Sequence, residues 1–400
     1  MTLIEADRIA LQTFFQSQPA WSGVLSARKA INQKDFTLLH SGPPMAVEKA
    51  IPTLNSAAVA CVFEGWAGDF LEADELIRSG KITFLPAQDY SVATPLAAVV
   101  SPSMQLISMV DQNNDENKAY SPINGGGHGG VHAPRYGRKS SEALDLLKFL
   151  NTDLAMTIAM ATERPIPWFP IIDESLIRGD DAHLRHVFAN KKLLKIFDEI
   201  LPAPFQNSKE RNFIEKWPIF NLNFWMAAAK CSLSAASGIA GSSFVTAMGG
   251  NGNEFGIKIS GKPDTWFYDP AGIPKGKTRE PFLPEDCTGA YGDSALSECF
   301  GLGAMALSFC PEMQKIHEGF FDSSIFDISK CLFKFEHPSF PKSKARAGLF
   351  VSAIIEENVT PIIELGLVEK TGNHGGLGAG LYTAPMSTFK NAFDTVKTNS

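Results

Sequence analysis

Four glycine-rich stretches of the chain carry hydroxyl, amide, carboxyl or imidazole side chains. Glycine allows backbone N–H groups to approach an anion closely, and hydroxyl or amide side chains add further donors. Such loops are suited to phosphate or carboxylate groups, whereas the alternative for any one of them is a plain turn or a close-packing position. None matches a P-loop or a G-x-G-x-x-G dinucleotide fingerprint. The four stretches are 125–130 around His128, 238–252 with Ser242, Ser243, Thr246 and Asn251, 292–294 with Asp293 and Ser294, and 372–380 around His374.

The segment 179–186 places two imidazoles and a carboxylate three residues apart. On a helix, Asp180, His183 and His186 would share one face and could bind a divalent metal ion. The alternative is a solvated helix start, at which Asp180 and Asp181 complement the helix dipole. We predict no cofactor from this segment and keep a divalent metal as an open possibility.

The sequence contains little that indicates a nucleophilic enzyme. Ser242 lies in Gly241-Ser-Ser-Phe-Val, which lacks the second glycine of a nucleophile elbow. Cys231 and Cys299 fall within apolar helical patterns and are expected to be core thiols. A pair between Ser294 and His374 stays open, because the sequence gives no distance between them.

Periodicity indicates a mixed α/β, multi-domain fold, in which two mixed α/β domains flank a helical module. We expect an N-terminal α/β domain at 1–138, a helical module at 139–210, and a C-terminal α/β domain with the glycine-rich loops at 211–400. Apolar runs predict strands at 57–63, 81–85, 96–100, 105–110, 244–248, 254–260, 265–268, 349–355 and 361–368. Helical spacing predicts helices at 71–78, 142–161, 173–200 and 221–236, and a further helix that begins near 292 with Asp293 or Ser294 as its N-cap. The polar stretch 111–118 leads into the glycine-rich stretch 124–130, which is expected to be a loop.

The composition excludes several classes of protein. The 400 residues include 36 Lys+Arg and 43 Asp+Glu, a net charge of −7, with 44% hydrophobic and 20% charged residues. This balance is typical of a globular protein and offers no basic surface for nucleic acid. The six cysteines form no C-x-x-C pair and no apolar run is long enough for a membrane span, so we expect a cytoplasmic protein with reduced thiols and no membrane partner. The acidic start of the chain does not resemble a secretory signal.

A series of collinear motifs carries a family resemblance. In their order and spacing they resemble the AllG-like (YlbE-like) subunits of oxamate carbamoyltransferase, formerly a domain of unknown function, from about His40 to Gly380. The motifs are His40-Ser-Gly-Pro-Pro44, Phe63-Glu-Gly65, Val100-Ser-Pro-Ser-Met104, Gly179-Asp-Asp-Ala-His-Leu-Arg185, Phe220-Asn-Leu-Asn-Phe224, Gly238-Ile-Ala-Gly-Ser-Ser243, Val245-Thr246, Asn251-Gly252, Phe255-Gly-Ile257, Ser260-Gly261 and Gly292-Asp-Ser294.

The resemblance implies a bacterial transferase of allantoin and purine nitrogen metabolism that works in an oligomer, homomeric or with other subunits. Its reaction would move a carbamoyl group between phosphate and a small amide or amine acceptor such as oxamate, through carbamoyl phosphate. Such a reaction needs anion contacts, a clamp for a carboxylate or phosphate, and a proton shuttle. Candidate catalytic residues are His183, Arg185, Asp293 and His374, and candidates for binding the anionic substrate are Ser242, Ser243, Thr246, Asn251, Ser294 and His128.

The chain also departs from the family pattern. Family members carry a histidine before the turn that precedes Ser101, but here 88–95 read Gln88-Asp-Tyr-Ser-Val-Ala-Thr-Pro95. The loop around His128 is richer in glycine than the family pattern. Two other functions stay open: an amide-processing hydrolase or ligase on the same scaffold, and a non-catalytic subunit of a heteromeric complex.

Overall fold

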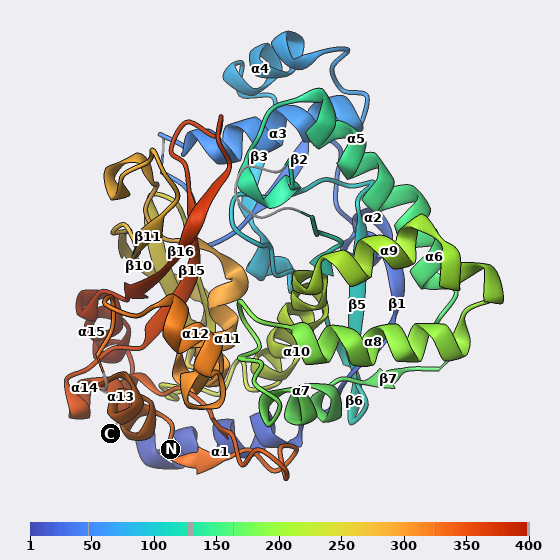
Figure 1. Ribbon diagram of the computed structural model, residues 1–400. Helices are drawn as coiled ribbons and strands as arrows, with labels where there is room; N and C mark the ends of the chain where they lie inside the picture. The colour runs from blue at the N-terminus through green and yellow to red at the C-terminus, as the bar shows by residue number, and fades with distance from the viewer. Residues whose placement is uncertain (47, 127–131, 163, 323, 398–400) are drawn as a thin grey trace.

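The computed structural model describes residues 1–46, 48–126, 132–162, 164–322 and 324–397, which form a mixed α/β fold (Figure 1). The strands are β1 (Pro19–Ser26), β2 (Thr37–His40), β3 (Thr83–Pro86), β4 (Val99–Val100), β5 (Gln105–Asp111), β6 (Asn114–Pro122), β7 (Ile166–Pro167), β8 (Val245–Asn251), β9 (Glu254–Ile259), β10 (Lys262–Pro270), β11 (Lys275–Thr278), β12 (Tyr291–Gly292), β13 (Phe335–Glu336), β14 (Arg346–Ala347), β15 (Ile362–Val368) and β16 (Gly376–Thr383). They pair in the orders β6-β5-β1-β7, β10-β9-β8-β12, β11-β16-β15, β13-β14 and β3-β2-β4.

Helices cover these sheets and separate them. They are α1 (Leu3–Gln16), α2 (Ala27–Ile31), α3 (Ile51–Phe63), α4 (Phe70–Arg78), α5 (Ser141–Phe149), α6 (Ala155–Ala159), α7 (Phe169–Leu176), α8 (Val187–Ile200), α9 (Lys209–Lys216), α10 (Asn221–Ala235), α11 (Leu296–Phe300), α12 (Pro311–Ile316), α13 (Ser324–Leu332), α14 (Val351–Glu357) and α15 (Met386–Asp394). In Figure 1, α3, α4 and α5 lie at one end of the molecule and α1 at the opposite end.

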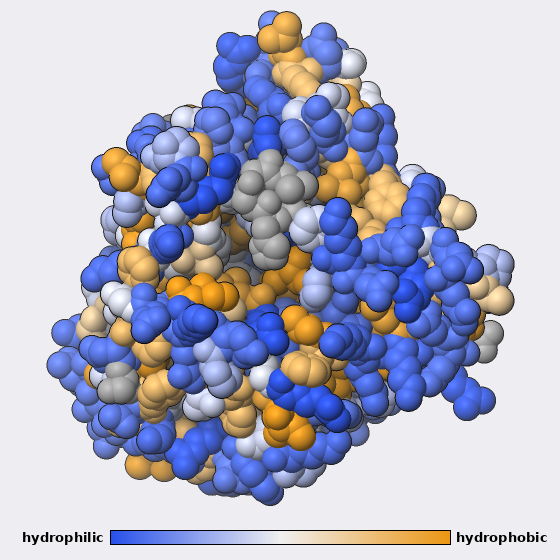
Figure 2. Space-filling model, viewed as in Figure 1, coloured by the Kyte–Doolittle hydropathy of each residue, from blue (hydrophilic) through white to orange (hydrophobic). Residues whose placement is uncertain are grey.

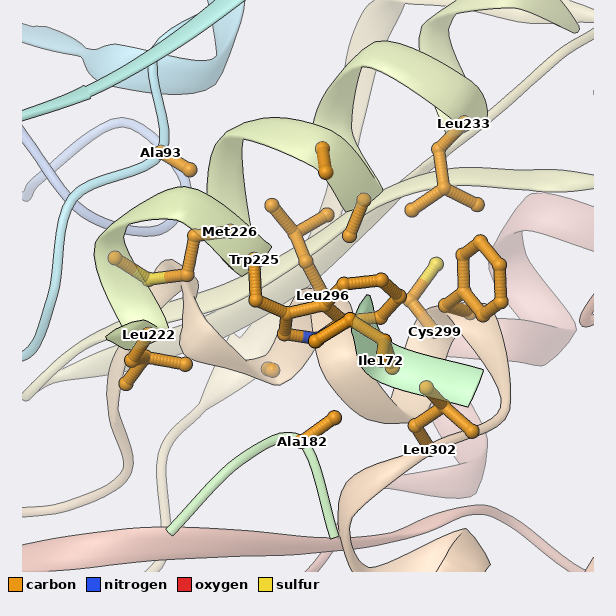
Figure 3. Packing of buried hydrophobic residues seen from close by; sticks show 14 of the residues in the cluster. Ala93, Ile172, Ala182, Leu222, Trp225, Met226, Leu233, Leu296, Cys299 and Leu302 are labelled. Atoms are coloured by element: carbon orange, nitrogen blue, oxygen red, sulfur yellow. The ribbon is translucent and has the colours of Figure 1, made fainter. Parts of the chain in front are cut away.

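Helix α10 is the centre of the main core. Its sequence is rich in alanine and contains neither glycine nor proline, which favours a helix, and its apolar residues are spread around the helix, so nearly all of it is buried. One side packs on β1, β5 and β6, and the other contacts β8 and α11. Figure 3 shows Leu222, Trp225, Met226 and Leu233 of this helix among Leu296, Cys299 and Ile172.

The predicted helices at 71–78, 142–161 and 221–236 are confirmed, with a π-helical turn at Leu150–Leu154 inside the second. The strands at 81–85, 105–110, 254–260 and 361–368 are also confirmed within a few residues. Of the strand expected at 96–100, only Val99–Val100 is formed. Strand β8 begins as expected but continues to Asn251, and β10 is longer than the expected 265–268.

Several element predictions are wrong. The runs 57–63 and 349–355 are the helices α3 and α14, because a short apolar run is compatible with a buried helix as well as a strand. The polar stretch 111–118, for which the sequence predicts no element, forms the turn of the hairpin between β5 and β6. Of the loop expected at 124–130, residues 124–126 lie in no helix or strand, and 127–130 lie outside the described residues. Neither Asp293 nor Ser294 caps α11, because both lie in a preceding 3₁₀ turn, and the stretch 372–380 enters strand β16.

The first helix belongs to the same core as the C-terminal half of the chain. Phe14 of α1 packs against Phe244 and Phe300, with ring centroids 5.2 and 5.0 Å apart. The domain boundaries at 138 and 210 stay a prediction. Among the described residues, we find no helix with the length and apolarity needed to cross a membrane.

His337 makes stability depend on pH. Its ring lies among phenylalanines, 5.1 Å from Phe169 and 5.2 Å from Phe340, and burial lowers its pKa to about 3. The folded state therefore binds fewer protons than the unfolded state, whose histidine pKa is about 6.5, so stability is lost as pH falls from about 6.5 towards 3 at up to about 1.4 kcal/mol per pH unit. Urea unfolding at pH 7 and pH 5 should show that His337→Leu removes about 2 kcal/mol of the acid-induced loss. An unchanged difference between the two pH values would contradict this account.

Candidate active site

A cavity of about 380 Å³ lies where the N-terminal segment, the middle of the chain and the C-terminal strands meet. Figure 2, seen from the same side as Figure 1, shows a hollow near the centre of the molecule with hydrophobic residues on its edge. The lining residues are Pro95, Leu96, Arg135, Tyr136, His183, Leu184, Ile219, Leu222, Arg279, Ser294, Met313, Ile316, Gly366, Gly376, Leu377, Gly378 and Ala379.

Two guanidinium groups in this cavity are held by carbonyl oxygens of the glycine-rich segments. Arg279 donates through Nη2 to the His374 carbonyl at 3.0 Å and through Nε to the Gly376 carbonyl at 3.3 Å. Arg135 donates to the Gly126 carbonyl at 2.8 Å, and its guanidinium lies 4.6 Å from the ring centroid of Tyr136. The cavity therefore contains two fixed positive charges within a mostly apolar wall.

Two glycines of the cavity wall, Gly366 and Gly376, leave no room for a side chain. A Cβ atom on Gly376 would lie 2.6 Å from the ring of Tyr136, and one on Gly366 would lie 3.0 Å from Leu96. Any side chain at Gly376 would displace the tyrosine that stacks on Arg135. Gly366 in β15 and Gly376 in the last glycine-rich stretch thus shape the cavity through close packing.

A cluster of buried ionisable groups begins at the His183 side of the cavity. His183 Nδ1 lies 2.8 and 3.0 Å from the two carboxylate oxygens of Glu298 in α11. Nearby, His317 Nε2 lies 2.8 Å from Oε1 of Glu364, which points inward from β15. Asp181 completes the cluster, and its Oδ1 accepts from the backbone N–H of His183 at 2.6 Å.

Burial and mutual repulsion shift the pKa values of this cluster. Burial, together with the charge of Glu364, raises the pKa of Asp181 to about 8. Burial likewise raises the pKa of Glu364 to about 8, and it lowers that of His317 to about 4. Burial alone would lower the pKa of His183, but the Glu298 carboxylate raises it above the usual value. Such shifted groups beside a cavity are typical of functional sites.

The segment 179–186 is not the helix that the three-residue spacing suggested, and the expected helix at 173–200 is divided there. Residues 177–186 form the irregular connection between α7 and α8. Within it, Asp180 Oδ2 accepts from the backbone N–H groups of Phe188 and Ala189, in the first turn of α8, at 2.8 and 2.9 Å. His186 Nε2 contacts the His183 carbonyl at 3.1 Å. The shared face of Asp180, His183 and His186 is therefore absent. The alternative of a solvated helix start is also wrong, because Asp180 and Asp181 are fully buried and precede the first turn of α8.

Of the predicted catalytic residues, the structure brings only His183 to the cavity wall. Arg185 donates to the Gly179 carbonyl at 3.0 Å and pairs with Glu312 at 3.6 Å outside the cavity. His374 is exposed, with its ring 4.8 Å from Phe282. Asp293 is fully buried beside the cavity-lining Ser294, and its carboxylate accepts from Gly42, Thr94 and Gln88.

The described anion-binding candidates do not meet in one pocket, although Ser242 and Ser243 share one partner. Ser242 and Ser243 both donate to the carboxylate of Asp7 in α1, at 2.9 and 2.8 Å, so their hydroxyls fix that helix. The Asn251 side chain holds its own β-turn and the Pro43 carbonyl. Thr246 lines a separate polar hollow of about 480 Å³ with Lys230 and Lys258, and only Ser294 lines the main cavity. His128 lies outside the described residues.

Sequence reasoning missed Arg135, Arg279, Glu298, Glu364 and His317. A signal was present for two of them: Glu364 interrupts the apolar run of β15, and Glu298 lies in an apolar helix, where a lone carboxylate is rarely buried without a reason. Nothing in the local pattern distinguishes the two arginines from exposed ones.

Three comparisons place the chain among known proteins. A family model described as "Oxamate carbamoyltransferase subunit AllG" matches residues 82–294. The chain is 28% identical to the oxamate carbamoyltransferase subunit AllG of Escherichia coli K12, over 99% of this chain and 98% of that protein. It is also 28% identical to the uncharacterized protein YahG of the same organism, over 97% of this chain and 84% of that protein.

The fold is that of a solved relative. The crystal structure of a conserved protein of unknown function from Enterococcus faecalis V583 superimposes with a TM-score of 0.91 at 26% identity, over 99% of this chain and 98% of that one. The family match spans more than half of the chain and includes Arg135, His183, Arg279 and Ser294 of the cavity. The chain belongs to the AllG family of oxamate carbamoyltransferase subunits.

Proposed function

We propose that this chain is a subunit of a carbamoyltransferase and that the cavity between Arg135 and Arg279 binds its small anionic substrate. The convergence of the two guanidinium groups on one cavity is the observation that carries the proposal. Guanidinium recognises carboxylate and phosphate groups by paired hydrogen bonds; carbamoyl phosphate carries a phosphate and oxamate carries a carboxylate. Because the wall is otherwise apolar, these charges act in a poorly hydrated space, where they are strong.

The reaction transfers the carbamoyl group from phosphate to a small amide such as oxamate. The acceptor nitrogen attacks the carbamoyl carbon, a C–N bond forms, the C–O bond to phosphate breaks, and the nitrogen loses a proton. His183 in its neutral form is the candidate base, since its ring lines the cavity and the Glu298 carboxylate orients it, although the same carboxylate raises its pKa. The Ser294 hydroxyl is a candidate donor to the developing oxyanion.

We further propose that the chain acts in a hetero-oligomer, because the curated E. coli relative carries the name of a subunit. The test is acceptor-dependent phosphate release from carbamoyl phosphate, measured with oxamate for the full chain alone and with its partner subunits. Turnover that needs oxamate supports the transferase. Release without an acceptor indicates a hydrolase, and absence of any turnover that depends on this chain would contradict a catalytic role.

Arg279→Met is expected to lower kcat/KM of the assembled enzyme by about 100-fold, since it removes a fixed charge from the cavity. Steady-state kinetics with varied carbamoyl phosphate and oxamate give the measurement, and Arg279→Lys should recover part of the loss because it restores the charge. The matched control is Arg8→Met, on the exposed face of α1. A loss below threefold for Arg279→Met would remove this residue from the site.

A further inference from the structure

The buried cluster below the cavity has the composition of a metal site. We propose that His183, Glu298 and Glu364, with Asp181 as a third carboxylate beside them, bind one divalent cation of the Mn²⁺ or Zn²⁺ type. Three carboxylates and one imidazole form the mixed oxygen and nitrogen donor set that such ions take. The ligands come from the connection after α7, from α11 and from β15, so the ion would join three segments that are distant in the sequence.

Three residues of the cluster place ligand atoms close together. One ligand atom from each of His183, Glu298 and Glu364 can be chosen such that all lie within 4.8 Å of one another, and none of the three residues is more than 1% exposed. Ligand atoms about 2.1 Å from one ion are at most about 4.2 Å apart, so small side-chain adjustments suffice. The 2.8 Å separation of His183 Nδ1 from Glu298 Oε1 is that of neighbouring ligands as well as that of an ion pair.

Two carboxylate oxygens of the cluster accept from no hydrogen-bond donor. Asp181 Oδ2 and Glu364 Oε2 are fully buried and accept from no N–H or O–H group among the described residues, while the Asp181 and Glu364 carboxyl groups lie within hydrogen-bond reach of each other. The other oxygen of each carboxylate is fixed, Oδ1 of Asp181 by the backbone N–H groups of His183 and Arg185, and Oε1 of Glu364 by His317. Each carboxylate is thus held by one oxygen and offers the other, as ligands with outer-shell support do.

The cluster holds more buried carboxylates than positive groups. Asp181 and Glu364 repel each other across the cluster, and isolated buried carboxylates are strongly disfavoured. Against three carboxylates, a protonated His183 supplies one positive charge, whereas a divalent ion supplies two at the point where the free oxygens lie. The alternative occupant is one or more protons shared by the carboxyl groups, which the experiment below distinguishes.

The cluster is also reachable. His183 belongs both to the cluster and to the cavity wall, so an ion could enter from the cavity and would lie next to the substrate. The inference is tested by metal binding rather than by turnover. A cation bound to the His183 ring would occupy its acceptor nitrogen, so metal binding and the role of this ring as base are alternatives.

The test uses the full chain, freed of metal with a chelator and titrated separately with Mn²⁺ and Zn²⁺ by calorimetry and by equilibrium dialysis with elemental analysis. We expect one ion per chain and a metal-dependent rise in Tm. Glu364→Gln, which preserves side-chain volume, should weaken binding by at least about 100-fold. The matched control is Glu312→Gln, an exposed acid whose amide variant should bind as the parent does.

A spectroscopic measurement keeps the proposal testable if Glu364→Gln does not fold. Pulsed electron paramagnetic resonance of the Mn²⁺-loaded wild-type chain should detect one imidazole nitrogen bound to the ion. The proposal is wrong if the wild-type chain binds neither ion at millimolar concentration, if Glu364→Gln leaves the affinity unchanged, or if the bound Mn²⁺ has no nitrogen ligand.

Discussion

Replacing Asp293 with alanine should lower the free energy of unfolding by about 3–6 kcal/mol. The carboxylate accepts from the backbone N–H groups of Gly42 and Thr94, both at 2.8 Å, and from Gln88 Nε2 at 2.7 Å. The variant would leave these buried donors without an acceptor, at about 1–3 kcal/mol each. Urea unfolding followed by circular dichroism gives the measurement.

The controls separate this structural role from the catalytic one that the sequence suggested. Asp293→Asn keeps one acceptor oxygen and should lose less than the alanine variant. Asp327→Ala, an exposed acid in α13, should change stability by less than about 0.5 kcal/mol. If Asp293→Ala unfolds as the parent does, the three contacts are not holding the N-terminal segment to the rest of the fold.

Replacing Trp225 with alanine should lower the free energy of unfolding by about 3–5 kcal/mol, because the cavity left in the main core collapses only in part. The indole is fully buried and lies 5.0 Å from the ring of Phe300. Its Nε1 donates to Ser297 Oγ at 2.9 Å, and that hydroxyl donates to the Ala182 carbonyl at 2.9 Å. The loop that carries His183 is thus tied to α10 by two successive hydrogen bonds (Figure 3 shows Trp225 and Ala182).

Chemical unfolding monitored by far-ultraviolet circular dichroism avoids the loss of the tryptophan signal. Trp225→Phe keeps most of the ring volume and should lose only about 1–2 kcal/mol. Trp66→Ala is the comparison at a less buried indole, which stacks on Phe36 with centroids 5.0 Å apart. Equal losses at positions 225 and 66 would show that the depth of burial does not set the cost.

Long periodic segments of the fold were predictable. The helix at 221–236 was identified from its spacing, because many residues contribute to one pattern. The strand predictions at 57–63 and 349–355 are wrong because seven residues are too few to distinguish a period of two from one of 3.6. In the first of these, Pro52 at the first turn of α3 was an available sign of a helix start.

A residue of the site could be predicted only where it stands in a recognisable local motif. His183 and Ser294 stood out locally, and both line the cavity, although their roles stay predictions. Arg279 and Glu364 reach the site through strand pairing and helix packing between distant segments, which no local pattern encodes. Gln88, at the position range where the family pattern suggests a histidine, instead binds Asp293 and the Met248 carbonyl.

The contacts of Asp7 have a consequence for the timing of synthesis. Its carboxylate is bound by Ser243 and also by Ser352, whose hydroxyl lies 3.1 Å away and 345 residues later in the chain. At bacterial rates of about 5–20 residues per second, α1 would wait roughly 20–70 seconds on the ribosome for its last partner. During that interval its apolar face, including Phe14, has no final docking surface, so folding of the main core must be a late event in translation.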